Sequence, residues 1–192
     1  KQVPVLTTLF PALQAATDAS FQCMPVDFKQ SFNAYLTATR ADLPVKSLAD
    51  VIAGGQFLDS VKAFITDAQA KTDTIATSTA CQQYLTARTA ASAAITALMD
   101  KEGVDLLVYP AANQPAFAAG AAPPAGWYGF QVMSSPTGLP SLTMPMGIAA
   151  TSGAPVGMIF LARGYQEGKL VQAGYSYQKQ FKPRSAPPAV VP

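Results

Sequence analysis

Apolar residues recur at helical spacing early in the chain, and we predict an amphipathic helix over residues 26–39. The residues that share its apolar face are Phe28, Phe32, Tyr35 and Leu36. The longest periodic segment runs over residues 79–103. It is rich in alanine, which favours a helix, and Gly103 is a suitable stop.

Weaker signals surround these two segments. Ser47 and Asp50 have the spacing of a capping box, and Gly54 can end the short helix that they begin. Residues 56–76 also read as helical, but with a less regular pattern. The first ten residues, KQVPVLTTLF, alternate poorly but are apolar enough that we expect a strand or an extended segment there.

Short apolar runs bounded by turn residues predict the strands. The run VDLLVYP ends at Pro110, as expected of a buried strand. The runs PSLTMPMGI and APVGMIFLAR flank the turn signal TSGAP and predict an antiparallel pair. A last helix should follow over residues 166–181, with one apolar face made by Leu170, Ala173, Tyr177 and Phe181.

Two segments between the strands lack a strand pattern. Residues 111–126 are rich in Ala, Gly and Pro and predict a long loop, and long loops in compact domains are often functional. The following WYGFQVMSS predicts a short helix. The order of helices, strand, loop, strand pair and helix indicates an α/β chain with one sheet covered by helices.

Length and composition set limits on this interpretation. At 192 residues and 49% hydrophobic, the chain can bury one core, so we expect residues 1–182 to form one domain or part of one. Residues 183–192 form a Pro-rich tail. Lys1 has no preceding Met, and we expect a processed piece of a larger protein.

The low charge and the short apolar runs argue against two classes of partner. Only 12% of residues are charged, the net charge is +2 and no segment is strongly basic, which argues against a nucleic-acid interface. No apolar run approaches the roughly 18 residues of a membrane span, so no membrane partner is expected. The low charge leans towards an exported protein, extracellular or periplasmic rather than cytoplasmic.

The two cysteines, Cys23 and Cys81, leave several states open. The sequence has no histidine, so an ordinary zinc site is excluded, and no metal or other cofactor is expected. The cysteines can bond to each other, bond to a partner chain or remain buried thiols. A bond between them requires Cα atoms within about 7 Å.

The pair Ser134-Ser135 is the obvious nucleophile candidate. Without histidine only a Ser–Lys arrangement is left, Lys169 is the nearest downstream lysine, and no G-x-S-x-G elbow surrounds the pair. Serines beside a turn usually satisfy the backbone, so we expect that role near Pro136. The acidic cluster of Asp100, Glu102 and Asp105 likewise predicts a solvated helix end rather than a metal site.

A pocket wall is the better functional prediction. Trp127, Tyr128 and Phe130 fit a core by residue type. A helix over residues 126–135, however, would place polar and apolar groups on one face, as small-molecule sites require. These residues are Tyr128, Gln131, Val132 and Ser135. The loop residues Asn113 and Gln114 follow a strand, where α/β folds often bind ligands.

Four segments of the chain carry motifs in a characteristic order. The run GLPSLTMPMGIAATSGAPVGMIFLARGYQEGKLVQAGYSYQ shows a Gly-Leu-Pro, a strand ending in Pro-x-Gly, a turn, and Pro-Val-Gly before a second strand. The other three are VDLLVYPAANQPA, DFKQSFNAYL and VKSLADVIA. In their order these segments resemble the C-terminal part of amidase signature family hydrolases, and together they cover most of residues 26–181.

This resemblance implies a fold and a chemistry. The fold would be the C-terminal portion of the amidase signature fold, a mixed β-sheet core covered by α-helices. The family's Ser nucleophile, its second Ser on a cis peptide and its Lys lie in a Gly/Ser-rich region of the N-terminal half, which nothing here matches. No catalytic residue is therefore expected in this chain, and Ser134-Ser135 is not the catalytic pair. Many relatives have Asn where Ser135 stands.

The implied function is that of the non-catalytic half of a serine amide hydrolase that forms an acyl-enzyme. The expected partners are the N-terminal catalytic half and a small-molecule amide or ester. The six substrate-binding candidates would be Tyr128, Gln131, Val132, Ser135, Asn113 and Gln114. Two alternatives stay open: a non-enzymatic structural or binding module, although half a sheet would expose apolar surface, and an independent Ser–Lys hydrolase.

Overall fold

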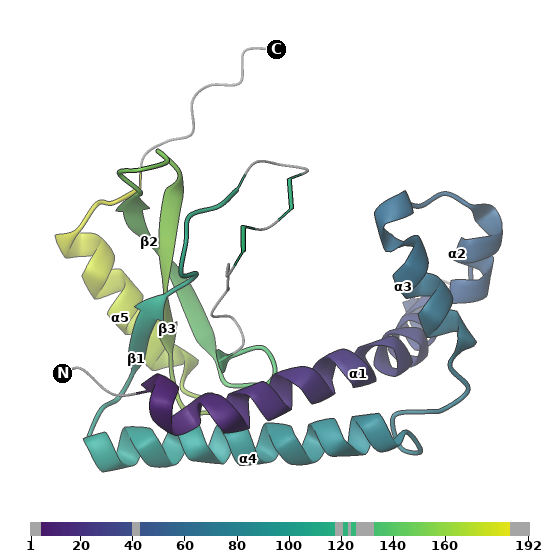
Figure 1. Cartoon of the computed structure of the whole chain (residues 1–192), viewed down its shortest axis with the longest axis horizontal. Helices are drawn as coiled ribbons and strands as arrows, with labels where there is room; N and C mark the ends of the chain where they lie inside the picture. Colours follow the sequence, from purple (N-terminus) through teal and green to yellow (C-terminus); the bar gives the residue numbers. More distant parts are fainter. Residues whose placement is uncertain (1–4, 40–42, 118–120, 123, 126–132, 185–192) are drawn as a thin grey trace. The chain divides into compact units, whose positions relative to one another are not determined.

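The computed structural model describes residues 5–39, 43–117, 121–122, 124–125 and 133–184. Within these residues, five helices and three strands follow one another (Figure 1): α1 (Val5–Thr39), α2 (Leu48–Gly54), α3 (Asp59–Ala70), α4 (Thr79–Glu102), β1 (Leu107–Pro110), β2 (Ser141–Ile148), β3 (Pro155–Leu161) and α5 (Glu167–Gln180). The chain divides into two compact units. Residues 8–91 form the helical unit, and residues 1–7 with 92–192 form the sheet unit.

The first helix begins earlier than the sequence pattern indicates. The expectation of a strand or extended segment is wrong for residues 5–10, which form the start of α1, while residues 1–4 lie outside the described residues. Leu9, Leu13 and Ala16 are buried at helical spacing and extend the apolar face that was predicted only from residue 26 onward. That burial offsets the local penalty of the two prolines inside the helix.

Aromatic packing and one disulfide hold the helical unit together. The Phe28 ring stacks on Phe32 at 5.3 Å between centroids and lies against Phe64 at 5.1 Å. Cys23 of α1 and Cys81 of α4 form a disulfide with 4.6 Å between their Cα atoms, which settles the state that the sequence left open. The bond closes a long loop, because the two cysteines are 58 positions apart.

Polar contacts fix the helix ends in this unit. The predicted capping box is confirmed: the Asp50 N–H donates to Ser47 Oγ at 3.2 Å, and Asp50 Oδ2 accepts from the Lys46 N–H at 2.9 Å. Lys29 Nζ donates to the carbonyl oxygens of Gln69, at 2.8 Å, and Lys71, at 2.6 Å. A cation at the C-terminal end of α3 also complements the helix dipole.

The other helices are confirmed, one of them with shorter bounds. The helix α3 occupies only Asp59–Ala70 of the predicted 56–76, and α4 covers the long periodic segment. Gly103 ends α4 with a φ of +61°, and its N–H donates to the Asp100 carbonyl at 3.1 Å. No helix in the described part of the chain is long and apolar enough to cross a membrane.

The three described strands form an antiparallel sheet in the order β1-β3-β2. The predicted pair of β2 and β3 is confirmed, joined by a turn in which Gly153 has a φ of +66°. The strand β1 is confirmed too, but it lies at an edge of the described sheet and only Leu107 is buried. Its neighbour Val108 is 58% exposed, so the prediction of a buried strand is wrong for this residue. An apolar run does not by itself show whether other elements cover it.

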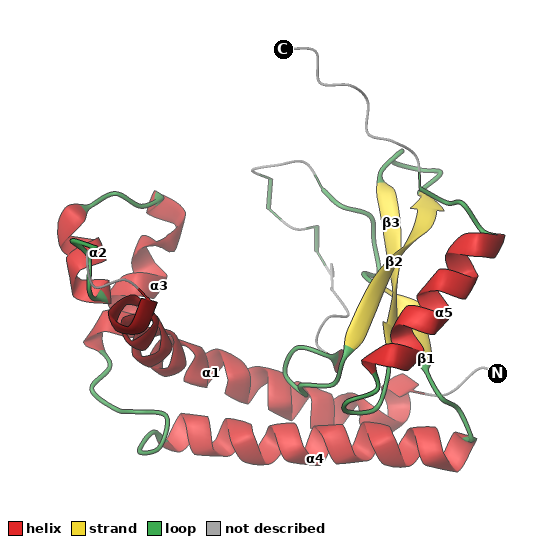
Figure 2. Cartoon of the chain, turned by 180° about the vertical axis from the view of Figure 1, so that it is seen from behind, coloured by secondary structure: helices red, strands yellow, loops and turns green. Residues whose placement is uncertain are grey.

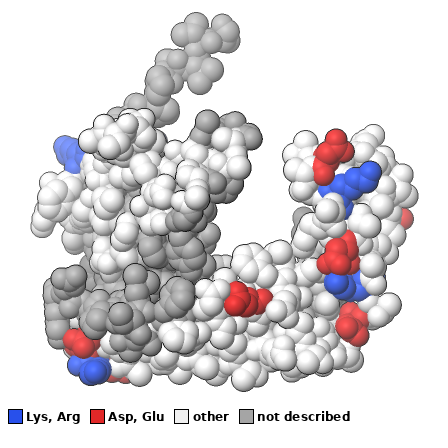
Figure 3. Space-filling model, in the orientation of Figure 1, with Lys and Arg blue, Asp and Glu red and all other residues white. Residues whose placement is uncertain are grey.

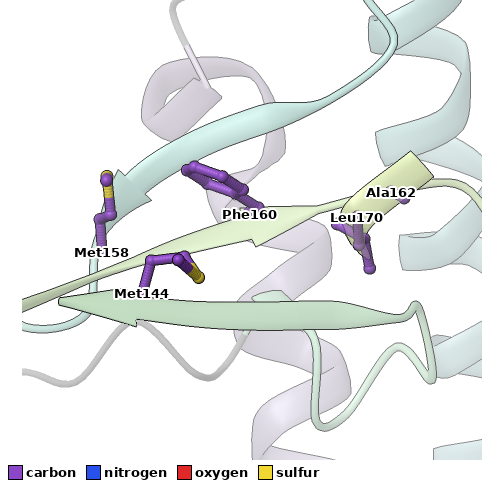
Figure 4. Close-up of a cluster of buried hydrophobic side chains, with 5 residues drawn as sticks. All are labelled: Met144, Met158, Phe160, Ala162 and Leu170. Atoms are coloured by element: carbon purple, nitrogen blue, oxygen red, sulfur yellow. The ribbon is translucent and has the colours of Figure 1, made fainter. Parts of the chain in front are cut away.

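The helix α5 packs along one face of this sheet (Figures 1 and 2). Under it lies a buried cluster of Met144, Met158, Phe160, Ala162 and Leu170 (Figure 4). The Tyr177 ring meets Phe160 edge-on at 6.1 Å. Gly174 allows the close approach, since a Cβ there would stand 2.6 Å from Leu142 Cδ2. The predicted α/β class is confirmed, and the predicted apolar face is confirmed for Leu170, Ala173 and Tyr177. It is wrong for Phe181, which follows the end of α5 and is 55% exposed.

Candidate functional site

A pocket of about 460 Å³ lies at the end of the sheet where β1 passes into its loop. Three segments of the sheet unit form its wall: residues 110–116, Met146 of β2, and residues 155–157 of β3. The volume falls in the usual range for small-molecule sites. Residues 110–116 begin at the end of β1, and residues 155–157 are the start of β3. The register between β1 and β3 therefore brings these two segments together.

Backbone pairing holds the loop against β3. The Ala111 N–H donates to the Gly157 carbonyl at 2.8 Å, directly after β1 ends at Pro110. Gly157 itself lies close to its neighbours, since a Cβ there would stand 3.4 Å from Thr143 Cγ2 and 3.7 Å from the Ala111 Cβ. This hydrogen bond fixes the start of residues 111–116 relative to the strands.

A β-bulge shapes the opposite side of the pocket. Pro145 pairs with Gly157 and Gly147 with Val156, so Met146 has no partner in the ladder. Gly147 has a φ of +144°, a backbone conformation that residues with side chains rarely adopt. On the helix side, Tyr177 Oη donates to the Pro145 carbonyl at 3.2 Å. The bulge is therefore held from both the strand and the helix.

The chemistry of the lining is that of an uncharged ligand site. None of the described residues that line this pocket is acidic or basic. Asn113 and Gln114 supply side-chain amides, which both donate and accept hydrogen bonds, and the other lining residues are apolar or glycine. Charged side chains are also sparse on the face drawn in Figure 3. In the described part of the chain no group of three or more His, Cys, Asp or Glu could hold a metal ion.

Only some of the predicted site residues line the pocket. Asn113 and Gln114 line the pocket and are exposed. Ser135 is exposed but does not line it. Most of the predicted helix over residues 126–135 lies outside the described residues, because these omit 126–132 and with them Tyr128, Gln131 and Val132. Trp127, Phe130 and residues 185–192 of the tail also lie outside them. In its described part the helix prediction is wrong, because Met133 is a 3₁₀ residue and the Ser pair lies in a turn.

Sequence reasoning missed Met146 and residues 155–157 as pocket residues. A usable signal was present, because a Gly that follows Pro-x inside a strand pattern suggests a bulge. In the sequence analysis the Pro-x-Gly and Pro-Val-Gly motifs support only the family resemblance, not a pocket.

The Ser pair lies in a tight turn. Residues 134–138 follow a 3₁₀ residue, and the turn is closed by Thr137 Oγ1, which donates to the Met133 carbonyl at 2.7 Å. The Gly138 N–H donates to the Ser134 carbonyl at 2.9 Å. Lys169 Nζ instead donates to Asp105 Oδ1 at 2.6 Å, so the lysine that a Ser–Lys arrangement would require is engaged in an ion pair.

Ion pairs account for two residues of the acidic cluster. Arg163 Nε donates to Asp100 Oδ1 at 3.0 Å, and Arg163 Nη1 donates to the Val104 carbonyl at 3.1 Å. The hydrogen bond from Lys169, followed by its charge, lowers the pKa of Asp105. Both carboxylates are largely exposed, which confirms the predicted solvated helix end.

Sequence comparison finds relatives among amidotransferases. Over 83 residues the chain is 37% identical to a glutamyl-tRNA(Gln) amidotransferase subunit of Pseudomonas putida (strain W619), a match that covers 41% of this chain and 17% of that protein. A match to the same subunit of Anaeromyxobacter dehalogenans is 32% identical over 91 residues and covers 45% and 18%. The matches thus span less than a fifth of these relatives' length.

Solved structures resemble nearly the whole chain. The peptide amidase of Stenotrophomonas maltophilia is 28% identical with a TM-score of 0.69, over 93% of this chain and 36% of that one. The structure of PAM12A is 25% identical with a TM-score of 0.70, over 97% and 43%. An amidase family protein from Bacillus anthracis shares the fold at 23% identity and a TM-score of 0.62, over 88% and 30%. The predicted fold, that of amidase signature enzymes, is confirmed, and the chain covers less than half of each of these structures.

Residues 2–171, which make up most of the chain, match the Amidase family. The match includes every segment of the pocket wall and the bulge beside it. The chain therefore belongs to the amidase family.

Proposed function

We propose that this chain is the non-catalytic, pocket-lining part of an amide-bond hydrolase. The observation that carries the proposal is the uncharged pocket formed by the loop after β1, the β2 bulge and the start of β3, all within the segment that matches the family. Its size and its mixture of apolar groups with two side-chain amides suit a small neutral amide.

The reacting groups would come from the N-terminal part of the same enzyme. A Ser there would attack the amide carbonyl to give an acyl-enzyme, and water would then release the acid. A second Ser and a Lys would carry the protons, and backbone donors would stabilise the oxyanion. This chain, which has no segment that resembles the family's Gly/Ser-rich catalytic region, would be inactive by itself.

The residues of this chain would bind and orient the substrate. Asn113 and Gln114 would hydrogen-bond polar groups of the substrate beside the scissile bond, and the apolar wall would exclude water. Tyr128, Gln131, Val132 and Ser135 remain candidates for the same wall. The strand β1 lies at an edge of the described sheet, which supports a sheet that the catalytic part extends, and the exposed Val108 supports a sheet face that this part covers.

Similarity to a peptide amidase makes peptide amides the first substrates to test. The uncharged lining supports neutral members of that class. The disulfide between Cys23 and Cys81 supports an exported enzyme, since disulfides persist in oxidising compartments.

The test is to find the nucleophile in an active preparation. We would separate its polypeptides under denaturing conditions, sequence their N-termini, and label the native preparation with a fluorophosphonate, which reacts with activated serines. Labelling of a Gly/Ser-rich segment outside these 192 residues, together with hydrolysis of a peptide amide, is the expected result.

The variants Ser134→Ala and Ser135→Ala serve as controls and should leave labelling unchanged. Loss of labelling in either folded variant would instead favour an independent Ser–Lys hydrolase. A preparation that contains only this chain, folded and without hydrolysis, would favour the non-enzymatic binding module.

A further inference from the structure

We propose that Met146 is a specificity-determining residue of the pocket, and that its side chain contacts an aromatic group on a neutral amide ligand. The inference rests on the proposed function for the identity of the ligand as an amide. Its geometric basis, the bulge and the pocket wall, does not depend on that function.

The bulge distinguishes Met146 from every other residue of β2. Its neighbours Pro145 and Gly147 are paired with β3, whereas Met146 is left out of the ladder. An inserted residue of this kind changes the direction of a side chain relative to the regular pleat, and bulges recur beside active sites for that reason. Met146 lines the pocket and remains 45% exposed.

Two nearby residues of the same strand show what the bulge changes. Met144, two positions earlier, is 6% exposed and belongs to the core under α5. Ile148, two positions later, is 51% exposed and does not line the pocket. Three residues at alternate positions thus have three roles: core, pocket wall and open surface.

The anchoring of the bulge keeps Met146 in place. Tyr177 Oη donates to the carbonyl of Pro145 at 3.2 Å, and the Tyr177 ring packs against Phe160 in the core. The opposite wall is fixed by the hydrogen bond from the Ala111 N–H to the Gly157 carbonyl. The backbone on both sides is therefore set, and the adaptable element between them is the methionine side chain.

The chemistry of the wall indicates the ligand. Methionine is unbranched and polarizable, and its sulfur makes favourable contacts with aromatic rings. Pro155 and Val156 add apolar surface beside it, while Asn113 and Gln114 supply hydrogen bonds. In a peptide amide with an aromatic side chain, the ring would contact the apolar residues and the amide groups would hydrogen-bond Asn113 and Gln114. The pocket volume of about 460 Å³ accommodates such a ligand.

The test compares two probes that differ only in the side chain: N-acetylphenylalaninamide and N-acetylglycinamide. Binding is measured by methyl NMR with ¹³C-labelled methionine on the protein as isolated, with its catalytic part where the preparation contains one. The Met146 signal among the six methionines is assigned from Met146→Leu. We expect the aromatic probe to shift this signal saturably.

The variant Met146→Ala should weaken binding of the aromatic probe about tenfold, because it removes roughly two methylene equivalents of apolar contact. Binding of the glycine probe should change less than twofold. The matched control Ile148→Ala, on the same strand and similarly exposed, should leave both affinities unchanged.

The outcomes separate this proposal from the proposed function. An unshifted Met146 signal, or equal affinities in wild type and Met146→Ala, overturns the role of Met146 even if the preparation hydrolyses peptide amides. Met146-dependent binding of the aromatic probe, in a preparation that contains the catalytic part but does not hydrolyse peptide amides, upholds the role of Met146 and overturns the proposed enzyme.

Discussion

The helical unit and the sheet unit are stabilised in different ways. In the helical unit, a disulfide and a lysine connect segments that are 58 and about 40 positions apart, and a phenylalanine cluster fills the space between helices. In the sheet unit, a continuous backbone ladder fixes β1, β3 and β2, and α5 covers one face.

This difference explains why the candidate pocket belongs to the sheet unit. A ladder places the backbone of distant segments in a fixed register, so residues 110–116, Met146 and residues 155–157 meet with defined geometry. Side-chain packing between helices stabilises a unit but fixes its loops less directly. Sites held by backbone pairing provide the more rigid wall for a ligand.

The largest effect should come from removing the disulfide. The double variant Cys23→Ala with Cys81→Ala should lower the stability of the helical unit by about 4 kcal/mol, since the bond restricts a 58-residue loop in the unfolded chain. Hydrogen exchange measures each unit separately, and amides of β3 should keep most of their protection. Reduced wild type serves as the control, because it breaks the bond without removing atoms.

An equal loss of protection from hydrogen exchange in both units would contradict the difference between them. It would show that the two units unfold as a single cooperative body.

A smaller effect, in the sheet unit, should follow from Gly147→Val. The φ of +144° is strained for a residue with a Cβ, so we expect a loss of about 1–3 kcal/mol in the free energy of unfolding, measured with urea. Gly164→Val is the matched control: a Cβ meets nothing within 4 Å there, and its φ lies outside the unfavourable range. That variant should change stability by less than about 0.5 kcal/mol.

Equal stability of the two glycine variants would contradict the bulge geometry. The Met146 methyl signal offers a second readout, since a straightened strand would move it even where the stability hardly changes.

The smallest effect concerns two exposed carboxylates, one in each unit. The pKa of Asp50 is lowered first by the hydrogen bond from the Lys46 N–H, and that of Asp105 first by the hydrogen bond and then by the charge of Lys169. At 1 M salt the Debye length falls to about 3 Å, so the pKa of Asp105 should rise more than that of Asp50. NMR titration of the carboxyl signals measures both.

The sign of the pH dependence is the same for both groups. A lowered pKa in the folded state stabilises the fold above the ordinary value of 3.8, and this contribution is lost as the pH falls through the lowered pKa. Lys169→Met should raise the pKa of Asp105 towards 3.8 and leave Asp50 unchanged. An unchanged pKa of Asp105 in this variant would show that the ion pair is absent in solution.

Local signals in the sequence predicted many of the elements. Helical spacing identified α4 and α5, the capping box identified the start of α2, and the turn signal TSGAP identified the β2–β3 hairpin. The start of α1 was missed, because the burial of Leu9, Leu13 and Ala16 is a property of the folded chain that local spacing does not show. Local propensity is a weak guide wherever burial decides the conformation.

The site was predicted only in part. Asn113 and Gln114 were found because they follow a strand, and a strand end is visible in the sequence. Met146 was missed because its place depends on a ladder in which Pro145 and Gly147 are paired and it is not.

By itself, the sequence determined the helices, the turns, the family resemblance and the absence of histidine, since each depends on residues close together in the chain or on composition alone. The tertiary structure decided which cysteines bond, that β1 lies at an edge of the described sheet, and which three segments enclose the pocket. These features depend on contacts between distant residues. Their geometry is set by register and packing, which are properties of the folded chain.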